Sequence, residues 1–170
     1  MTKLIELTEI VLFDWGNTLM VDFPDAQGKM CDWEVVEEVA GAREVLAALS
    51  KQHKLYVATN AADSTEQDII QAFERAAMSQ YLSGYFCKAS LGVSKYDSDF
   101  YPAIITQLGV QAQDVTMIGD TLEKDIYPAL ASGLHAVWLN TRDDALDDAL
   151  DDAVDGAIVQ IQSLIQLVET

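Results

Sequence analysis

The first residue in this sequence whose setting suggests chemistry is Asp14, a lone carboxylate at the end of an apolar run. The run, Ile10–Phe13, is closed by Asp14 and then by the turn-forming residues Gly16 and Asn17. A short apolar run bounded by turn residues is typical of a buried strand in a parallel sheet. Asp14 would then lie at the carboxyl end of that strand, where ligands bind in open α/β sheets. On this stretch alone, Asp14 could equally cap the following turn.

Four more polar residues stand in comparable places further along the chain. Thr59 follows a second apolar run, Lys95 lies in the loop beyond a third, and Asp120 closes a fourth. Asp125 comes five residues later and can reach back to the same edge. Because the carboxyl ends of parallel strands meet at one edge of a sheet, we expect these side chains to converge with Asp14.

A set of carboxylates, a lysine and a hydroxyl at one sheet edge is suited to phosphoryl transfer. Carboxylates together with water and a phosphate are the ligands that Mg²⁺ prefers. A lysine neutralises phosphate oxygens as a point charge, and hydroxyl or backbone N–H groups donate hydrogen bonds to them. A carboxylate beside the phosphate can act as the nucleophile and form an aspartyl-phosphate.

The elements that must position these residues are predicted to alternate along the chain. The expected strands are 10–13, 54–60, 85–89, 114–120, 135–140 and 156–159. Strands that alternate with helices imply right-handed crossovers and a three-layer, doubly wound parallel α/β sheet of the Rossmann-like kind.

Five helices are predicted between and after the strands. The first carries apolar positions at helical spacing from Val35 to Leu49, and the second is opened by a capping box of Ser64 and Gln67. The third runs from about residue 97 and ends at Gly109. The others are expected around residues 126–132, with Pro128 in the first turn, and through 164–168.

Length and composition favour a single globular domain over residues 1–170. The polar stretch over about 20–34 is expected to form a flap or lid, with no separate cap domain. The net charge of −18 argues against nucleic acid and anionic membranes as partners. The sequence has no apolar run long enough to span a bilayer and no signal-peptide pattern, and Cys31 and Cys87 form no disulfide framework. A cytoplasmic protein is therefore expected.

One segment has an unusual composition, because residues 143–152 repeat Asp-Asp-Ala-Leu with a period of four. The pattern is typical of a solvated, weakly helical surface segment. A calcium site is the alternative, although paired aspartates at this period lack the spacing of a calcium-binding loop.

Four motifs, taken in order, give the sequence a recognisable pattern. They are Phe13-Asp14-Trp15-Gly16-Asn17-Thr18-Leu19, Ala58-Thr59-Asn60, Gly92-Val93-Ser94-Lys95 and Gly119-Asp120-Thr121-Leu122-Glu123-Lys124-Asp125. Together they resemble the haloacid dehalogenase-like hydrolase superfamily over nearly the whole chain. The resemblance implies a Rossmann-like sheet of strand order 5-4-1-2-3, with Asp14 on the central strand.

The resemblance also implies a role for each matched residue in an Mg²⁺-dependent phosphomonoester hydrolase. Asp14 would be the nucleophile. Thr59, Asn60 and Lys95 would bind the phosphoryl group, and Lys95 would also pair with the carboxylates.

The metal ligands implied by the resemblance come from the first and last motifs. Asp14 and Asp120 would hold Mg²⁺ together with the backbone carbonyl of Gly16, and Asp125 would support the metal directly or through water and Lys95.

The sequence departs from the family pattern at Gly16, where related phosphatases usually carry a second aspartate as general acid and base. Proton transfer of this kind typically contributes ~10²–10⁴-fold. The departure predicts a preference for substrates with good leaving groups, unless Asp22, Asp25 or Asp63 approaches the cleft. Alternatively, the protein is catalytically weak or inactive and binds a phospho-ligand or a protein partner.

Two other reactions of the resembled superfamily fit this sequence less well. A carbon–halogen hydrolase also lacks the second aspartate, but Gly119-Asp120 with Asp125 is the phosphatase-type metal pattern. A phosphonoacetaldehyde-type hydrolase needs a Schiff-base lysine from a cap, and Lys29 is the only lysine between the first two motifs.

The space available for covering the site is small. An open cleft is expected, which suggests a phosphorylated macromolecule as substrate or a homo-oligomer in which a neighbouring subunit covers the site. A phosphorylated small molecule is the alternative substrate class. Trp33 in the flap could contact substrate or pack on its own helix, and Trp15 is expected to pack in the core.

Overall fold

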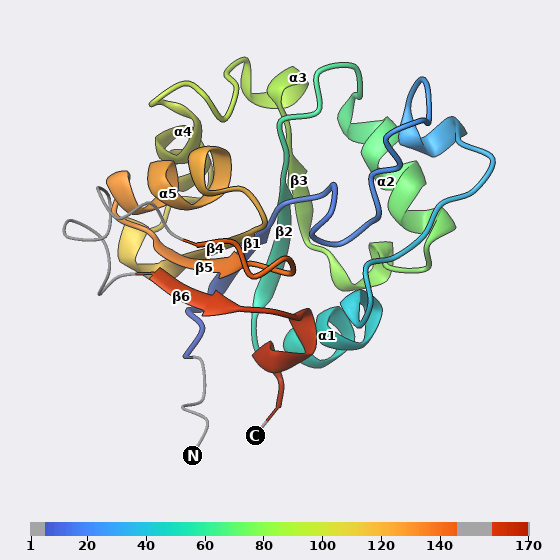
Figure 1. Ribbon diagram of the computed structural model, residues 1–170. Coiled ribbons are helices and arrows are strands. Elements are labelled where there is room, and N and C mark those ends of the chain that lie inside the picture. Colours follow the sequence, from blue (N-terminus) through green and yellow to red (C-terminus); the bar gives the residue numbers. More distant parts are fainter. Residues whose placement is uncertain (1–5, 146–157, 170) are drawn as a thin grey trace.

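The computed structural model describes residues 6–145 and 158–169, and its centre is a parallel six-stranded sheet (Figure 1). In spatial order the strands are β3 (Gly84–Phe86), β2 (Lys54–Ala58), β1 (Ile10–Phe13), β4 (Val115–Gly119), β5 (His135–Leu139) and β6 (Ile158–Ile161). All five pairings are parallel. The predicted order 5-4-1-2-3 is confirmed, with β6 added beside β5.

Helices cover both faces of this sheet, as the alternating pattern predicted (Figure 1). The α-helices are α1 (Ala42–Leu49), α2 (Glu66–Arg75), α3 (Lys88–Leu91), α4 (Phe100–Leu108) and α5 (Tyr127–Ala131). Short 3-10 helices are η1 (Met30–Asp32), η2 (Ser79–Tyr81), η3 (Ala112–Asp114) and η5 (Leu164–Leu167), and η4 (Leu122–Ile126) is a π-helix. Among the described residues, no helix has the length and apolar content that crossing a bilayer requires.

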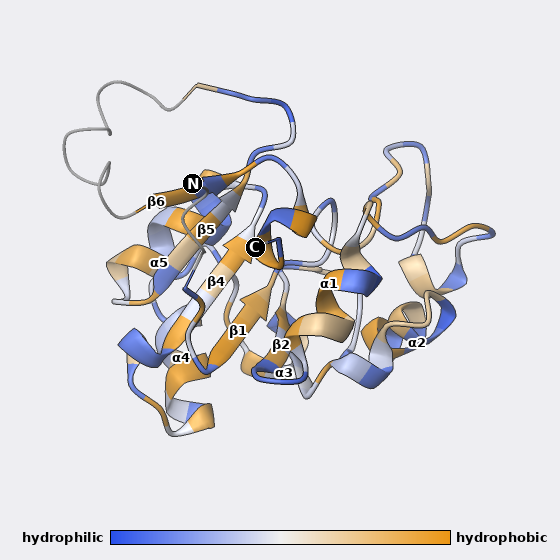
Figure 2. Cartoon of the chain, turned by 90° about the horizontal axis from the view of Figure 1, so that it is seen from below, coloured by the Kyte–Doolittle hydropathy of each residue, from blue (hydrophilic) through white to orange (hydrophobic). Residues whose placement is uncertain are grey.

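The two sides of β1 belong to two different cores, because successive side chains of a strand point to opposite faces. Val11 and Phe13 pack with α1, α2 and η5, whereas Ile10 and Leu12 pack with α4 and α5. All four residues are buried, which is why the strand is apolar throughout. Figure 2 shows this concentration of apolar residues on β1 and β4 in the middle of the sheet.

The helix predicted over residues 35–49 is wrong in its first half. Helix α1 begins only at Ala42, after Gly41 in the left-handed region (φ 81°). Val35 is 60% exposed, so it is not part of an inward face. The preceding chain is instead held extended, because the backbone N–H groups of Val21 and Val39 donate to Glu37 and Leu19. Pairing with the first loop thus overrides the helical periodicity.

Three other local predictions needed adjustment. The capping box of α2 is formed by Thr65 and Asp68 rather than by Ser64 and Gln67. Strand β3 ends at Phe86, because Lys88 and Ala89 open the short helix α3. The last helix is the 3-10 helix η5. Gly109 does end α4 in the left-handed conformation, and Pro128 does lie in the first turn of α5.

The flap, residues 20–34, is held against α2 (Figure 1). Arg75 of α2 donates hydrogen bonds to the backbone carbonyls of Cys31, Trp33 and Glu34. Lys29 forms an ion pair with Asp68 at 2.7 Å. Several side-chain contacts therefore anchor this irregular segment. Of the acidic repeat predicted over 143–152, residues 146–152 lie outside the described residues.

The position of the α2 capping box can be tested by substitution. Thr65→Ala removes the hydroxyl that accepts the Asp68 N–H, so it is expected to lower the free energy of unfolding by about 1 kcal/mol. Ser64→Ala is the matched control and is expected to cost less, since Ser64 makes no cap bond. Urea denaturation of both variants measures this, and equal losses would contradict the assignment.

Candidate active site

Asp14 follows β1 and is fixed between two strand ends. Its backbone N–H donates to the carbonyl of Ile118 at 2.9 Å, which continues the pairing of β1 with β4. Asp120 directly follows β4, so strand register brings these two aspartates to neighbouring positions. Asp14 is 5% exposed and Asp120 is half-buried. The convergence predicted from the strand ends is therefore observed.

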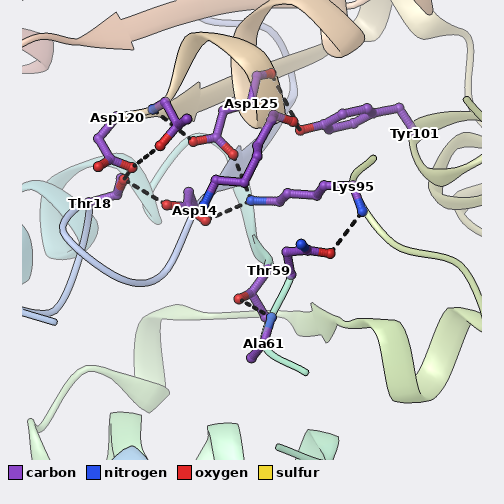
Figure 3. Close-up of polar contacts among 11 residues, drawn as sticks. Asp14, Thr18, Thr59, Ala61, Lys95, Tyr101, Asp120 and Asp125 are labelled. Atoms are coloured by element: carbon purple, nitrogen blue, oxygen red, sulfur yellow. Dashed lines mark hydrogen bonds and ion pairs between the residues drawn. The ribbon is translucent and has the colours of Figure 1, made fainter. Parts of the chain in front are cut away.

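Lys95 lies between two of the carboxylates and is fully enclosed (Figure 3). Its Nζ is 2.6 Å from Oδ1 of Asp14 and 2.7 Å from Oδ1 of Asp125. Burying a charge is unfavourable unless partners compensate it, and here two carboxylates do so. The lysine comes from the loop between α3 and α4, whereas Asp125 belongs to η4, so the ion pairs join segments distant in sequence.

The π-helix η4 sets the position of Asp125. The Asp125 carboxylate accepts a hydrogen bond from the backbone N–H of Thr121 at 3.1 Å. The hydroxyl of Tyr101, from α4, is 2.9 Å from the carbonyl of Lys124 and 3.3 Å from that of Asp125, and donates to them. The sequence analysis did not identify Tyr101 as part of this site, because its apolar neighbours made it look like an ordinary core residue of α4.

Gly119 leaves the room that Asp125 occupies. A Cβ atom built on Gly119 would overlap the carboxylate of Asp125. The glycine of the Gly-Asp pair is therefore required by close packing, and its backbone φ is not positive.

Two further residues hold Asp120. The Thr18 hydroxyl is 3.2 Å from Oδ2 of Asp14 and 3.4 Å from Oδ1 of Asp120, so it bridges the two aspartates (Figure 3). Trp138 of β5 donates its indole N–H to the Asp120 carbonyl at 3.1 Å. Thr18 lies in the first recognised motif, but sequence reasoning assigned it no role. Nothing local in the sequence singles out Trp138.

Thr59 and Asn60 lie on the other side of the cleft, at the end of β2. The Thr59 hydroxyl accepts a hydrogen bond from the Ala61 N–H at 3.2 Å (Figure 3). The Asn60 side chain accepts the backbone N–H of Lys95 at 3.0 Å, which ties the Lys95 loop to β2. Thr59 and Asn60 line the same cleft as Asp14.

The three carboxylates are close enough to share one cation. One oxygen each from Asp14, Asp120 and Asp125 lies within 4.8 Å of the others. A carboxylate set of this kind, beside an open cleft, fits the preference of Mg²⁺ for oxygen ligands. The backbone of Gly16 borders the same cleft. The donors predicted from the sequence thus fit a divalent cation chemically.

The charges in this cluster shift the acidities of its members. Burial raises the pKa of Asp120 to about 7, and the nearby negative charge of Asp14 adds to the effect. Burial also raises the pKa of Asp125, to about 6, against the opposing influence of Lys95. For Asp14, burial acts upward, but the charge and hydrogen bond of Lys95 outweigh it and lower the pKa. Asp14 is thereby kept ionised, as a nucleophile requires.

The cleft in front of Asp14 has a volume of about 410 Å³ and is open on one side. Its walls include Lys29 and Trp33 of the flap, Asp63 of the β2–α2 loop, and Lys124 of η4. The Trp33 indole donates to the Gly28 carbonyl at 3.1 Å and its ring lies 6.2 Å from that of Phe23. Trp33 therefore borders the cleft and does not pack on a helix of its own.

The remaining predicted candidates are structural or peripheral. Trp15 is buried in the core beside Phe73, as expected, although it also borders the cleft. His53 contacts the carbonyl of Thr8 at 2.7 Å, and His135 is exposed at the start of β5. Neither histidine lies in the carboxylate cluster.

A comparison with protein families identifies the family to which this chain belongs. The family model described as haloacid dehalogenase-like hydrolase matches residues 17–133. This segment contains Thr59, Lys95, Asp120 and Asp125, and it begins three residues after Asp14. The chain belongs to the haloacid dehalogenase-like hydrolase family.

Similar curated proteins are phosphatases and nucleotidases. The chain is 33% identical over 103 residues to human N-acylneuraminate-9-phosphatase, covering 58% of the chain and 39% of the human protein. It is 28% identical over 108 residues to the pyrimidine 5'-nucleotidase YjjG of Escherichia coli, covering 63% of the chain and 47% of YjjG. The match thus spans less than half the length of these relatives.

Solved structures share the fold at low sequence identity. An uncharacterized protein from Listeria monocytogenes has a TM-score of 0.81 at 21% identity, covering 93% of both chains. The magnesium-bound HAD-hydrolase YfnB of Bacillus subtilis has a TM-score of 0.73 at 14% identity, covering 95% of this chain and 97% of YfnB. A 2-haloacid dehalogenase from Pseudomonas syringae has a TM-score of 0.72 at 17% identity, covering 95% and 96%.

The requirement for glycine at position 119 gives the first prediction from this site. Gly119→Ala is expected to displace the Asp125 carboxylate and to lower the free energy of unfolding by about 1–3 kcal/mol, as overpacking of a core does. Gly16→Ala is the control and is expected to cost less, because its Cβ would meet only the exposed side chain of Asp22, at 3.3 Å. Thermal denaturation measures both, and a Gly119→Ala protein as stable as wild type would refute the packing argument.

The raised pKa values of Asp120 and Asp125 give a second prediction, for Mg²⁺ binding. A cation competes with the protons on these carboxyls, so its affinity should rise with pH until both are ionised. Lowering the pH from 8 to 6 crosses the Asp120 pKa of about 7 and is expected to weaken binding about tenfold. Isothermal titration calorimetry measures this, and Asp25→Asn, outside the cleft, should retain the dependence. Affinity that is constant between pH 6 and 8 would contradict the prediction.

Proposed function

We propose that this protein is an Mg²⁺-dependent phosphomonoester hydrolase that acts through an aspartyl-phosphate on Asp14. The observation that carries the proposal is the Asp14–Lys95–Asp125 ion-pair cluster with Asp120 beside it. This arrangement leaves the ionised Asp14 carboxylate facing an open cleft, with the Lys95 ammonium group and the Thr59 hydroxyl nearby. The similarity to two phosphomonoester hydrolases supports the proposal.

In this proposal Asp14, Lys95 and Thr59 carry out the chemistry. The Asp14 carboxylate attacks phosphorus, and the bond from phosphorus to the leaving oxygen breaks. Lys95 keeps Asp14 ionised, and together with Thr59 it holds the phosphoryl oxygens. Water then attacks phosphorus and frees Asp14 as a carboxylate, with release of inorganic phosphate.

The metal would be held by Asp14, Asp120, Asp125 and the backbone carbonyl of Gly16. When bound, Mg²⁺ would neutralise the negative charge of the carboxylates and of the phosphoryl group. The Thr18 hydroxyl and the Trp138 indole would orient Asp120 for this task, since both contact it.

Gly16 supplies no acid, so the proposed enzyme would favour aryl or acyl phosphates over alkyl phosphates. A good leaving group departs without a proton, whereas an alkoxide requires one. The same residue supports a second candidate function, in which the protein binds a phospho-ligand or a partner protein but does not turn it over.

The substrate class is narrowed by the size of the cleft. A volume of about 410 Å³ lies in the range of small-molecule sites, and the curated relatives are named for an acylneuraminate phosphate and for pyrimidine nucleotides. A phosphorylated small molecule is therefore favoured over a phosphorylated macromolecule. We further propose one core domain with the flap as a cover of the cleft, in a cytoplasmic protein that assembles as a homo-oligomer.

Asp14→Asn tests the proposed function. Wild type is expected to hydrolyse p-nitrophenyl phosphate only with Mg²⁺. Because a neutral amide is a poor nucleophile, the variant should lose activity by at least about 10³-fold. Release of p-nitrophenol measures turnover, and fluoroberyllate should form an Mg²⁺-dependent adduct with wild type alone.

The matched control is Asp25→Asn, which removes a flap carboxylate outside the cleft and should keep wild-type activity. Mg²⁺ binding without turnover or adduct in the wild type would favour the non-catalytic alternative. Equal turnover by wild type and Asp14→Asn would exclude Asp14 as the nucleophile.

A further inference from the structure

The chain has a free carboxylate beside the position where the recognised motif lacks one. A Cβ atom built on Gly16 would lie 3.3 Å from Cβ, 3.4 Å from Oδ2 and 3.6 Å from Cγ of Asp22. All three of its nearest neighbours are thus atoms of one side chain. The volume next to position 16 is already occupied by the carboxyl group of a residue six positions further along.

The tight loop after β1 brings Asp22 back to Gly16. The carbonyl of Trp15 accepts the N–H groups of Leu19 and Met20 at 3.0 and 3.1 Å, which folds the chain on itself. Asn17 adopts the left-handed conformation, with a φ of 58°. The Asn17 side chain then accepts the backbone N–H of Asp22 at 3.0 Å and holds the returning segment in place.

The two residues directly before Asp22 are fixed by backbone pairing. The N–H of Val21 donates to the carbonyl of Glu37 at 2.8 Å, and Met20 forms a bridge with Glu38. Met20 also accepts the Trp15 indole N–H on its sulfur at 3.2 Å. Asp22 therefore projects from an ordered loop, and its exposed carboxylate accepts no hydrogen bond from any residue that the structure describes.

The other two candidate carboxylates are placed less well. Asp22 lines the same cleft as Asp14, Asn17 and Asp120. Asp25 is on the flap but does not line that cleft, and Asp63 lines it from the opposite loop, after β2. Only Asp22 is adjacent to position 16.

We infer that Asp22 is the general acid and base of this site, replacing the carboxyl that position 16 lacks. The inference rests on the proposed phosphomonoester hydrolase. As the bond forms between Asp14 and phosphorus, the leaving oxygen takes the Asp22 proton and departs as an alcohol. In the second step Asp22 takes a proton from the attacking water, the Asp14–phosphorus bond breaks, and inorganic phosphate leaves. Asp22 is then protonated again, so protons balance over the cycle.

The role of Asp22 changes the leaving-group preference that is expected from Gly16. The preference for good leaving groups should be moderate in wild type, because Asp22 supplies a proton, and strong once Asp22 is changed. Gly16→Asp alone is expected to gain little, since the new side chain would meet Asp22 at close range and place a second negative charge beside it.

The test is a leaving-group series measured with Mg²⁺ on wild type and Asp22→Asn. The asparagine keeps the size of the side chain but has no proton to transfer. The expected result is a fall of about 10²-fold in kcat/KM for an alkyl phosphate and less than about threefold for p-nitrophenyl phosphate. Asp25→Asn is the control and should leave the series as in wild type. An equal effect of Asp22→Asn on all substrates, or none, would overturn the role of Asp22.

A second variant guards against an effect of the substitution on folding. Asp22→Ala removes the contacts of Cγ and Oδ2 with position 16, and the double variant Gly16→Asp with Asp22→Ala moves the carboxyl to the neighbouring residue. Recovery of alkyl phosphate turnover in the double variant, relative to Asp22→Ala, is the expected result. A folded double variant that hydrolyses p-nitrophenyl phosphate without this recovery would overturn the inference.

The two proposals fail in distinguishable ways. If wild type hydrolyses no member of the series, the proposed hydrolase itself is wrong, and the role of Asp22 falls with it. If wild type is active and Asp14→Asn is not, but the leaving-group dependence is the same with and without Asp22, only the present inference is wrong.

Discussion

The buried charge of Lys95 is the interaction on which the rest of the site depends. A lysine that is 1% exposed is tolerated only because Asp14 and Asp125 compensate it, and removing a partner from a buried ion pair typically costs about 3–5 kcal/mol. The same contacts join the end of β1, the loop after α3 and the π-helix after β4. They also lower the pKa of Asp14, so stability and the ionisation of Asp14 have a common origin.

Close packing around Gly119 makes this charge cluster possible. Asp125 reaches the lysine through the space that a side chain at position 119 would fill, and Tyr101 of α4 donates to the π-helix carbonyls. Burial raises the pKa of Asp120 to about 7, and the repulsion between carboxylates at such short range adds to the effect. A cation relieves that repulsion, so the geometry and the electrostatics both favour a metal at this point.

The flap gives the cleft a wall that is anchored before any ligand binds. Arg75 and Asp68 of α2 hold it through backbone carbonyls and through Lys29, so it presents Trp33 to the cleft. The loop that leads into the flap is also the loop that returns Asp22 to Gly16. One short segment thus forms a wall of the cleft and carries the carboxylate that lies beside position 16.

From the sequence alone, the alternation of apolar strands with helices determined the parallel sheet, because strands and helices both follow from local periodicity. The same alternation determined the edge of the sheet where four polar residues meet, namely Asp14, Thr59, Lys95 and Asp120. Only the tertiary structure decided the contacts between distant segments, namely the two partners of Lys95 and the support from Trp138 and Tyr101. It also decided that helix α1 begins only at Ala42. The position of Asp22 beside Gly16 was also decided there, since the path of a loop depends on pairings that no local pattern encodes.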